Sequence, residues 1–430
     1  MHDRNKQGNE TISANLVAAR QAQTQWAQRR LGERLQFVRE LRYSIAAHAH
    51  DLAVEAASVA QRPVAEKLVS EVLPLVDACR WLTQRAVRAL APRRCDRMGS
   101  PLWMRGVSFE VQRQPFGVVL VIGPGNYPLF LPAVQTLQAL VAGNAVLLKP
   151  APGTRGVALA FAKLARSAGL DPALLTILAD SVEAAQSAIA EGPDKVIFTG
   201  SSENGRDVLA TLATTNTPAI MELSGEDAML VLADANLDLV MGALRFGARL
   251  NGGDTCMAPR RLIVVDSIAD DLRARLLEAG VPAPKVERVP DVAAALELVS
   301  AADFALGVSI FSRDVRQARA WAARITSGFV TINDLIVPTA DPRMPFGGVK
   351  ASGFGVTRGH EGLLEMTFPH VVALRRGKAR PHFDDPGPGD ARLFSSYILA
   401  LHGRSGDRFG AIRDLINAII QKIKSRKTKP

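Results

Sequence analysis

The stretch from Gln114 to Leu148 contains no charged residue, and this constrains the fold more than any other feature of the chain. Its length is sufficient for a membrane span. However, the segment 123–132 (GPGNYPLFLP) interrupts it with two glycines, three prolines and an asparagine. Backbone broken in this way cannot satisfy its polar groups in lipid. The stretch therefore predicts a buried strand, a turn and a buried helix inside a folded domain.

Apolar runs and helical patterns alternate from this stretch onward. Predicted strands are VVLVIG, AVLLKP, KVIFTG and AIMELSG, followed in the second half by RRLIVVD, GVSIFS, GFVTIND and HVVALRRG. Predicted helices between them are LPAVQTLQALVAG, TRGVALAFAKLARSAG, NGRDVLATLATT, ADDLRARLLEAG, DVAAALELVSA and VRQARAWAARI. Such alternation predicts parallel sheets covered by helices on both faces. The glycine-rich segments 346–355 and 358–362 are expected to be loop.

The flanking regions have other patterns. Residues 15–91 show apolar positions at helical spacing and predict a helical region. Residues 102–117 alternate in polarity and predict a β-ribbon. Residues 379–390 (ARPHFDDPGPGD) have the composition of a linker. The length of 430 residues is consistent with two or three domains.

The net charge of +10 is concentrated at the end of the chain. Residues 404–430 hold eight Lys/Arg and two Asp, which leaves about +4 on the body, an ordinary value for an enzyme. Because aromatic residues make up only 5% of the chain and the body lacks a strong basic excess, we expect no nucleic-acid binding.

The three cysteines, Cys79, Cys95 and Cys256, have neither disulfide nor metal-ligand spacing, so we expect no metal. They fit a reducing compartment, and the polar N-terminus is no signal peptide. These features predict a cytoplasmic protein.

A basic amphipathic helix is predicted from about residue 411 to residue 427. Its apolar stripe is Ile412, Leu415, Ile416, Ile419, Ile420 and Ile423. Two interpretations remain open. The stripe packs on the body or on a second subunit, with basic residues complementing the helix C-terminus, or it contacts a membrane surface.

Four predicted strands end in residues that could take part in binding or catalysis. Asn126 follows the first buried strand, where open α/β sheets bind ligands, and its amide can donate to an oxyanion. Lys149 ends the next strand, Gly200 and Ser201 precede a helix that can face a phosphate, and Glu222 ends a fourth strand. Each alone has an ordinary explanation: turn chemistry, a solvated lysine, a tight turn or a salt bridge.

Cys256 lies in the glycine-containing segment NGGDTCMAPRR (251–261). A lone cysteine is commonly a small buried hydrophobe. In a flexible loop, however, a thiolate has the room to attack a carbonyl carbon. Cys256 is therefore a candidate nucleophile.

Taken together, PFGVVLVIGPGNYP, KP, FTGS, ELSG, NGGDTCMAPRR and PFGGVKASG resemble, in this order, the aldehyde dehydrogenase superfamily. The resemblance extends from about residue 15 to about 378. It implies two doubly wound, Rossmann-like α/β domains, a β-ribbon for oligomerisation and a homodimer or homotetramer.

The resemblance also implies NAD(P)-dependent oxidation of an aldehyde through a cysteine thiohemiacetal and a thioester. Cys256 would be the nucleophile, Asn126 and the backbone N–H of Cys256 the oxyanion hole, and Glu222 the base that activates water. Residues that would contact NAD or NADP are Pro124, Lys149, Gly200, Ser201, Gly205 and Leu223. Apolar residues expected along a substrate tunnel are Tyr127, Phe130, Leu131 and Met257, which favours a hydrophobic aldehyde.

Three departures from the family pattern stand out. No carboxylate follows Lys149, so a 2′-phosphate would be tolerated. ELSGED replaces the usual ELGGK. The interval after Cys256 is short and lacks the ExFGP glutamate that grips the nicotinamide ribose, for which Glu287 is a poor substitute. Part of the second sheet is therefore expected to be missing.

The resulting division assigns 1–100 and 115–224 to a nucleotide-binding domain and 225–360 to a shortened catalytic domain. Residues 101–114 and 366–378 form the ribbon, and 379–430 form the linker and basic amphipathic tail. The alternative is a non-catalytic or hydrolase-like relative that acts as a membrane-associated binding or scaffold protein.

Overall fold

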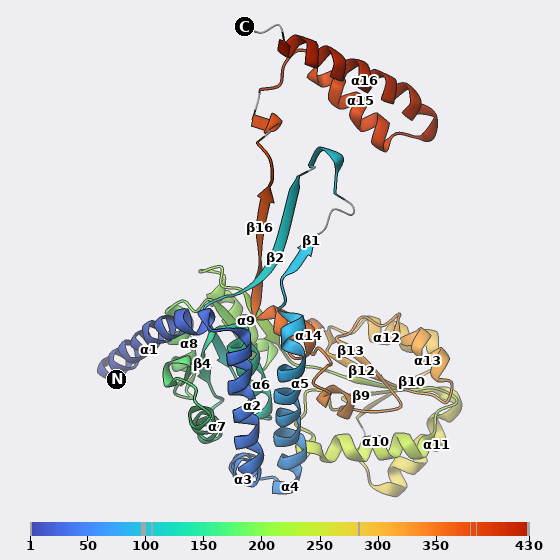
Figure 1. Cartoon of the computed structure of the whole chain (residues 1–430). Coiled ribbons are helices and arrows are strands. Elements are labelled where there is room, and N and C mark those ends of the chain that lie inside the picture. The colour runs from blue at the N-terminus through green and yellow to red at the C-terminus, as the bar shows by residue number, and fades with distance from the viewer. Residues whose placement is uncertain are drawn as a thin grey trace. The chain divides into compact units, whose positions relative to one another are not determined.

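The computed structural model describes residues 2–95, 100–104, 106–282, 284–378, 380–383 and 385–427. It divides into two compact units, residues 1–95 with 109–372, and residues 96–108 with 373–430. The chain is shown in Figure 1. Among the described residues no helix is long and apolar enough to cross a membrane.

The first sheet of the larger unit has six strands in the order β15-β7-β6-β3-β4-β5. They are β3 (Val118–Ile122), β4 (Ala145–Lys149), β5 (Leu175–Ile177), β6 (Lys195–Thr199), β7 (Ala219–Glu222) and β15 (Gly353–Phe354). Neighbouring strands pair in parallel except β15, which pairs antiparallel with β7. β3 and β4 are buried along their whole length, which explains why Lys149 at the end of β4 is their one charged residue.

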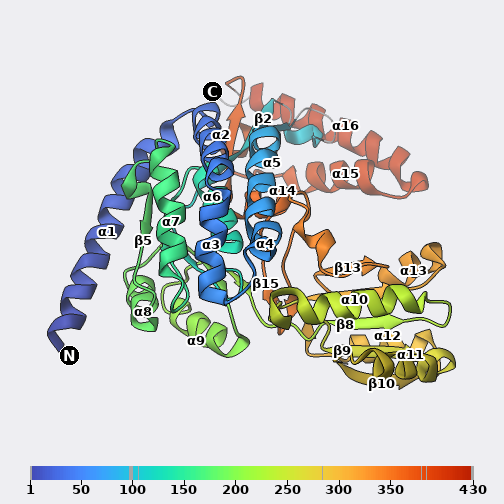
Figure 2. The same cartoon turned by 90° about the horizontal axis from the view of Figure 1, so that it is seen from below.

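The helices that pack around the first sheet come from two parts of the sequence, one before and one after the ribbon segment. Those after it are α6 (Phe130–Ala142), α7 (Arg155–Ser167), α8 (Val182–Ala190) and α9 (Ser202–Leu212), with a short 3-10 turn at Pro172–Leu174. Those before it are α1 (His2–Gln28), α2 (Leu31–Ala47), α3 (Ala49–Ala60), α4 (Val64–Lys67), the π-helix Leu68–Val72 and α5 (Leu73–Ala89). Helices α2, α3 and α5 lie beside α6 and α7 and share one core with them (Figure 2).

The second sheet has five parallel strands in the order β10-β9-β8-β12-β13. They are β8 (Ala228–Val231), β9 (Arg261–Val265), β10 (Lys285–Val289), β12 (Gly307–Phe311) and β13 (Phe329–Ile332). Its helices are α10 (Leu237–Arg249), α11 (Asp266–Ala279), α12 (Val292–Ser300) and α13 (Val315–Ala322). Two further core clusters lie around this sheet. The short interval after Cys256 thus still closes a continuous sheet.

Several elements differ from the sequence prediction. The glycine-rich segment 346–355 is not only loop, because it holds β15 and β14 (Val349–Lys350), which pairs with β11 (Phe304–Ala305). Segment 358–362 is not loop either, since it begins α14 (Gly359–Glu365). A three-stranded sheet, β1-β2-β16, contains the predicted ribbon. Its strands are β1 (Arg93–Cys95), β2 (Val107–Pro115) and β16 (Thr367–Arg375).

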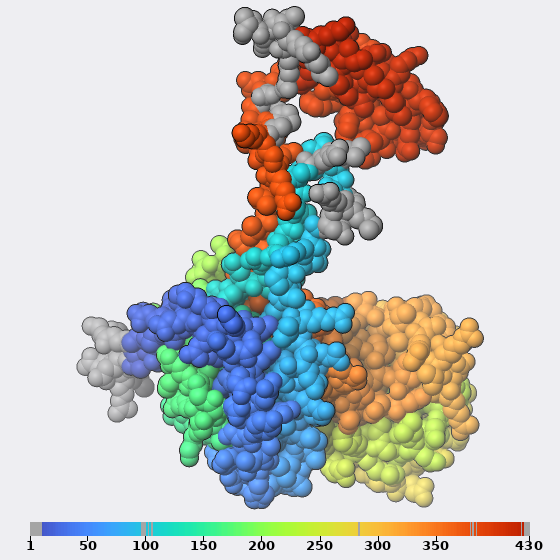
Figure 3. All heavy atoms as spheres, in the orientation of Figure 1, coloured from blue at the N-terminus to red at the C-terminus, as the bar shows by residue number. Residues whose placement is uncertain are grey.

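The smaller unit ends in two helices, α15 (Asp390–His402) and α16 (Ser405–Lys427). They pack against each other as a helical hairpin (Figure 1). Their atoms form the red group in the space-filling view (Figure 3). α16 covers the segment predicted as a helix, whereas α15 was not predicted. The remaining short helical turns are Leu102–Met104, Leu250–Gly253, Val337–Ala340 and Pro381–Phe383.

Candidate active site

A cavity of about 690 Å³ opens where the parallel strands β3, β4, β6 and β7 end. This is the edge at which open α/β sheets bind ligands. Eight of the nine residues predicted as functional line it: Pro124, Asn126, Lys149, Gly200, Ser201, Glu222, Leu223 and Cys256. The structure therefore brings together residues that are more than 130 positions apart in the chain.

Gly205 is the exception, because it lies in α9 behind the cavity wall. A Cβ atom added there would lie 2.5 Å from a methyl carbon of Leu223. Glycine at this position lets α9 pack closely on Leu223, which itself lines the cavity. Its contribution is therefore close packing behind the wall.

The loop that carries Cys256 is built from left-handed backbone. Asn251, Gly252 and Gly253 have φ values of 51°, 67° and 78°. Two of these three positions are glycine, which adopts positive φ without steric cost. Thr255, directly before the cysteine, is fully buried, and its hydroxyl lies 2.8 Å from that of Tyr127. The glycines thus form the turn, while Thr255 anchors the thiol end of the loop.

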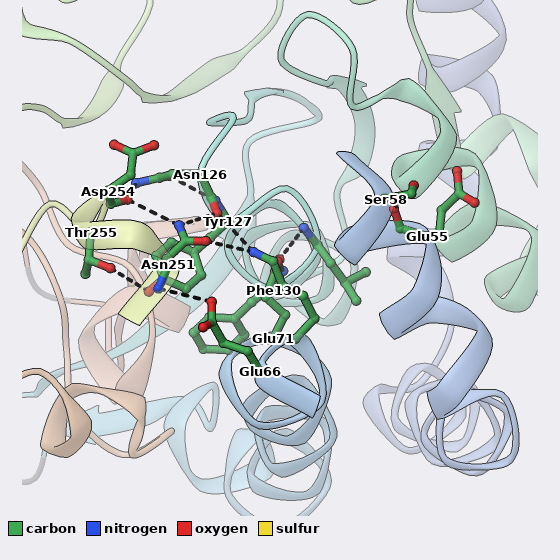
Figure 4. A network of polar contacts seen from close by, with 12 residues as sticks. Glu55, Ser58, Glu66, Glu71, Asn126, Tyr127, Phe130, Asn251, Asp254 and Thr255 are labelled. Atoms are coloured by element: carbon green, nitrogen blue, oxygen red, sulfur yellow. Dashed lines mark hydrogen bonds and ion pairs between the residues drawn. The ribbon is translucent and has the colours of Figure 1, made fainter. Parts of the chain in front are cut away.

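A buried polar network holds this loop against the loop of Asn126 (Figure 4). The Asn251 side chain donates to the carbonyl oxygen of Asn126 at 2.9 Å and accepts a hydrogen bond from the Lys67 ammonium at 3.0 Å. Lys67 also forms an ion pair with Glu71 at 2.9 Å, and both side chains are 0% exposed. Sequence analysis did not identify Lys67 or Glu71. The only local signal was a Lys-Glu pair inside an otherwise apolar helical segment, EKLVSEVLPLV.

Glu71 fixes the other side of the Asn126 loop. Its carboxylate accepts hydrogen bonds from the backbone N–H groups of Leu129 at 2.7 Å and Phe130 at 3.1 Å. These groups belong to the start of α6, where N–H groups have no partner within the helix. Lys67 and Glu71 therefore tie the N-terminal helices to both loops of the site.

Asn126 has the geometry of an oxyanion donor. Its Oδ1 accepts from the backbone N–H of Tyr127 at 2.9 Å, which fixes the amide orientation. Its Nδ2 donates to the carbonyl oxygen of Asp254 at 2.9 Å. An amide nitrogen carries two hydrogens, so one remains for a ligand. Among the described residues the backbone N–H of Cys256 has no carbonyl acceptor and contacts only its own thiol, so it can serve as the second donor.

Glu222 lies at the end of β7 and is 3% exposed. The Thr357 hydroxyl donates to one carboxylate oxygen and the Thr199 hydroxyl to the other at 3.3 Å. Burial raises the pKa of Glu222 above its ordinary value, while the Thr357 hydrogen bond and the Arg358 charge oppose the shift. A carboxylate with a raised pKa is a stronger base.

Burial raises the pKa of the Cys256 thiol to about 12, and the negative charges of Asp227 and Glu222 add to the effect. The thiol is therefore protonated at neutral pH and needs a base when it attacks. Of these two carboxylates, Glu222 lines the cavity and Asp227 does not. Asp227 instead accepts a hydrogen bond from the backbone N–H of Gly307 at 3.1 Å.

Arg358 is a cation that sequence analysis missed. Its guanidinium lies 4.2 Å from the ring centroid of Phe346 and 5.6 Å from that of Phe130, and it donates to the carbonyl oxygen of Thr339. Burial lowers its pKa to about 10, while Glu222 and Cys256 act to raise it. In return, its charge lowers the pKa of both groups.

We expect Arg358→Met to move the pH profile of the reaction at this site to higher pH. Removing the cation raises the pKa of Glu222 and Cys256, so both groups lose their protons only at higher pH. The measurement is kcat/KM against pH, with Arg358→Lys as the matched variant that keeps the charge. An unchanged profile in Arg358→Met would show that this charge does not act on the reacting groups.

The other end of the cavity holds groups that can bind a phosphate and hydroxyl groups. Lys149 is 4% exposed, and no hydrogen-bond acceptor for its ammonium is found in the described part of the chain. Burial lowers its pKa, while the charges of Asp180 and Glu183 act to raise it. Ser201 caps the N-terminus of α9 by accepting from the N–H of Asn204 at 3.2 Å. A free ammonium and a helix N-terminus suit ribose hydroxyls and phosphate.

Glu287 is not the missing ribose clamp. It lies on β10, accepts hydrogen bonds from Arg261 at 2.6 and 3.2 Å, and does not line the cavity. Arg261 lowers its pKa, as expected for a structural ion pair. The carboxylates that do line the cavity in the described structure are Asp207, Glu222 and Asp254.

Comparisons with known proteins identify the family of the chain. The profile of the aldehyde dehydrogenase family matches residues 2–283 and 281–372. The two matched segments meet within the interval that the sequence analysis found to be short. The chain belongs to the aldehyde dehydrogenase family, whose members are NAD(P)-dependent oxidoreductases.

Individual relatives are more distant. The chain is 28% identical over 429 residues to 4,4'-diapolycopene aldehyde oxidase of a Methylomonas species, covering 83% of this chain and 80% of the relative. It is 30% identical over 342 residues to vanillin dehydrogenase of Pseudomonas fluorescens, covering 62% and 71%. A solved structure of an NAD-dependent aldehyde dehydrogenase from Sinorhizobium meliloti has the same fold, with a TM-score of 0.81 at 24% identity, covering 87% and 89%.

Proposed function

We propose that this protein oxidises a hydrophobic aldehyde to a carboxylic acid with NAD or NADP, using Cys256 as the nucleophile. The observation that carries the proposal is one cavity lined by Cys256, Asn126 and Glu222 together with Lys149 and the N-terminus of α9. A thiol, an oxyanion donor and a base are the groups that covalent carbonyl chemistry requires.

The first step forms a bond between the Cys256 sulfur and the carbonyl carbon. The thiol proton moves to Glu222, and the carbonyl electrons move to an oxyanion that accepts from Asn126 Nδ2 and the Cys256 N–H. When bound, a nicotinamide supplies the acceptor for the hydride that leaves this carbon, so that an acyl group remains on sulfur. Pro124, Lys149, Gly200, Ser201 and Leu223 would hold this cofactor.

The second step releases the acid. Glu222 first releases the thiol proton to solvent and then takes a proton from water, and the resulting hydroxide adds to the acyl carbon. The carbon–sulfur bond breaks with its electron pair on sulfur, and the thiolate regains a proton from Glu222. The same carboxylate therefore accepts a proton twice, once from the thiol and once from water.

The substrate end of the cavity favours an apolar aldehyde. Leu131, Leu306 and Phe346 line it. Of the four tunnel residues expected from the sequence, only Leu131 lines the cavity, whereas Tyr127 hydrogen-bonds Thr255 and the Met257 sulfur accepts from Thr339. The relative named as a diapolycopene aldehyde oxidase is consistent with a hydrophobic substrate. We further propose a cytoplasmic homodimer or homotetramer assembled through the β1-β2-β16 sheet.

We expect Glu222→Gln to lower both the first turnover and the steady-state rate by about 10²- to 10⁴-fold, because glutamine cannot accept a proton. The measurement is stopped-flow formation of reduced nicotinamide from decanal and benzaldehyde, with NAD and NADP tested separately. If the variant still forms one reduced nicotinamide per site in a fast burst before the slow phase, Glu222 acts only in the hydrolysis of the acyl-cysteine. No turnover by the wild type with any pair would contradict the proposed function.

A further inference from the structure

The α15–α16 hairpin lies outside the part of the chain that matches the family. The matched residues end at 372, and the hairpin begins at Asp390. Within the hairpin, Lys422 forms an ion pair with Asp390 at 2.5 Å, and Arg392 lies 3.7 Å from Asp414. Small residues form the contact between the helices, since Ser396, Ala400, Ala411 and Ala418 are all buried. The two helices therefore form a hairpin that is held together by its own ion pairs and packing contacts.

One side of this hairpin is apolar and exposed. The exposed residues are Phe394, Ile398 and Leu401 on α15, and Phe409, Ile412, Ile416, Ile419 and Ile420 on α16. Phe409 is 83% exposed and Ile416 is 51% exposed. Around the axis of each helix, the exposed apolar stripe is rotated by about a third of a turn from the residues buried between the two helices. Because the helices run antiparallel, both stripes face the same side.

Charge is distributed unevenly around this apolar face. Helical spacing places Arg413 and Lys424 along one border of the α16 stripe. The two carboxylates of α16, Asp407 and Asp414, fall on the opposite side of the helix. Exposed apolar side chains bordered by cations, with the anions turned away, are the pattern of helices that lie in a membrane interface.

We propose that the α15–α16 hairpin docks on the surface of an anionic lipid bilayer, with its apolar stripes at the headgroup–acyl boundary and Arg413 and Lys424 at the headgroups. A second copy of the chain is the other possible occupant of such a face. That arrangement would bring like charges of two cationic hairpins together, whereas an anionic surface complements them. This inference does not depend on the proposed aldehyde chemistry.

The experiment is flotation of the full-length protein with phosphatidylcholine vesicles, with and without phosphatidylglycerol. We expect binding to the anionic vesicles only. The double variant Ile416→Gln/Ile420→Gln should lower partitioning at least about tenfold through lost apolar burial. Arg413→Gln/Lys424→Gln should lower it about 25-fold, since each basic residue near an anionic surface contributes about a fivefold factor.

Asn417→Ala/Gln421→Ala is the matched control, because both residues are exposed and lie one position after the two isoleucines. It should bind like the wild type, as should Cys256→Ala, which separates lipid binding from turnover. Absent or charge-independent binding of the wild type would overturn the proposal. So would a halved molar mass of Ile416→Gln/Ile420→Gln in light scattering with unchanged vesicle binding, which would assign the face to a second copy.

Discussion

Cys256→Ala is expected to lower aldehyde-dependent formation of reduced nicotinamide by at least about 10³-fold. The thiol supplies the bond that turns the aldehyde carbon into a hydride donor, and the alanine side chain has no nucleophilic atom. The cavity and its cofactor end should persist, because the Asn251–Lys67–Asn126 contacts do not involve the thiol. The measurement is the initial rate with decanal at saturating NAD or NADP, beside a cofactor-binding titration of the same variant.

Cys95→Ala is the matched control. Cys95 is also a partly buried free thiol, but it lies on β1 and does not line the cavity. Its substitution should leave the rate unchanged. An equal loss of activity in both variants would mean that the loss is not specific to Cys256. Retained activity in Cys256→Ala would show that Cys256 is not the nucleophile.

Lys67→Met is expected to destabilise the protein by about 3–5 kcal/mol and to reduce kcat. The substitution leaves the Glu71 carboxylate buried without its cation and the Asn251 side-chain oxygen without its donor. Since this network joins the Asn126 and Cys256 loops, the oxyanion donor and the thiol should also lose their relative position. The measurements are the urea midpoint of unfolding and kcat.

The double variant Lys67→Met/Glu71→Gln provides the decisive comparison. Glutamine can still accept from the backbone N–H groups at the start of α6 but carries no charge, so most of the lost stability should return. Lys285→Met is the surface control, because Lys285 is 72% exposed and lies 3.5 Å from Glu287. It should leave the midpoint unchanged. A Lys67→Met protein as stable as the wild type would refute the role of the buried pair.

The sequence predicted the parts of the fold that depend on local pattern. The buried strands β3 and β4 and the helix α6 follow from the uncharged stretch, because full burial on both faces excludes charge. The strands β5, β8 and β10 were not predicted. β5 has only three residues and β10 (KVERV) carries three charged residues, so their hydrophobic pattern is weak. β8 (AMLV) is apolar and fully buried, so its absence from the prediction has no such explanation.

The site was predicted in part for a similar reason. Asn126, Lys149, Glu222 and Cys256 stand at strand ends or in a glycine-containing loop, which are positions visible in the chain. Their roles were predicted from the order of their motifs, which resembles that of the family. Lys67, Glu71 and Arg358 act through contacts with residues far away in sequence. Lys67 meets Asn251 across 184 positions and Glu71 meets Leu129 across 58. A pattern within a short stretch of sequence cannot predict contacts between residues so far apart.

The shortened second half bears on the chemistry. The cavity keeps the thiol, the oxyanion donor and the base, and Glu287, which the sequence offered as a substitute for the ribose clamp, does not line it. The thiol steps depend only on residues that are present. Whether the carbon bound to Cys256 gives its hydride to a nicotinamide is therefore the central question, since a hydrolase-like relative would keep the thiol site without that transfer.

The most direct test uses decanal that carries deuterium on its aldehyde carbon, with NAD and NADP tested separately. If the protein is a working dehydrogenase, the deuterium appears on the nicotinamide ring in amounts equal to the decanoic acid formed, and Cys256→Ala forms neither product. If Cys256 becomes modified by the aldehyde or by an activated ester while no deuterium reaches the nicotinamide, the thiol site is intact but hydride transfer is absent. That result would contradict the account and favour the hydrolase-like alternative.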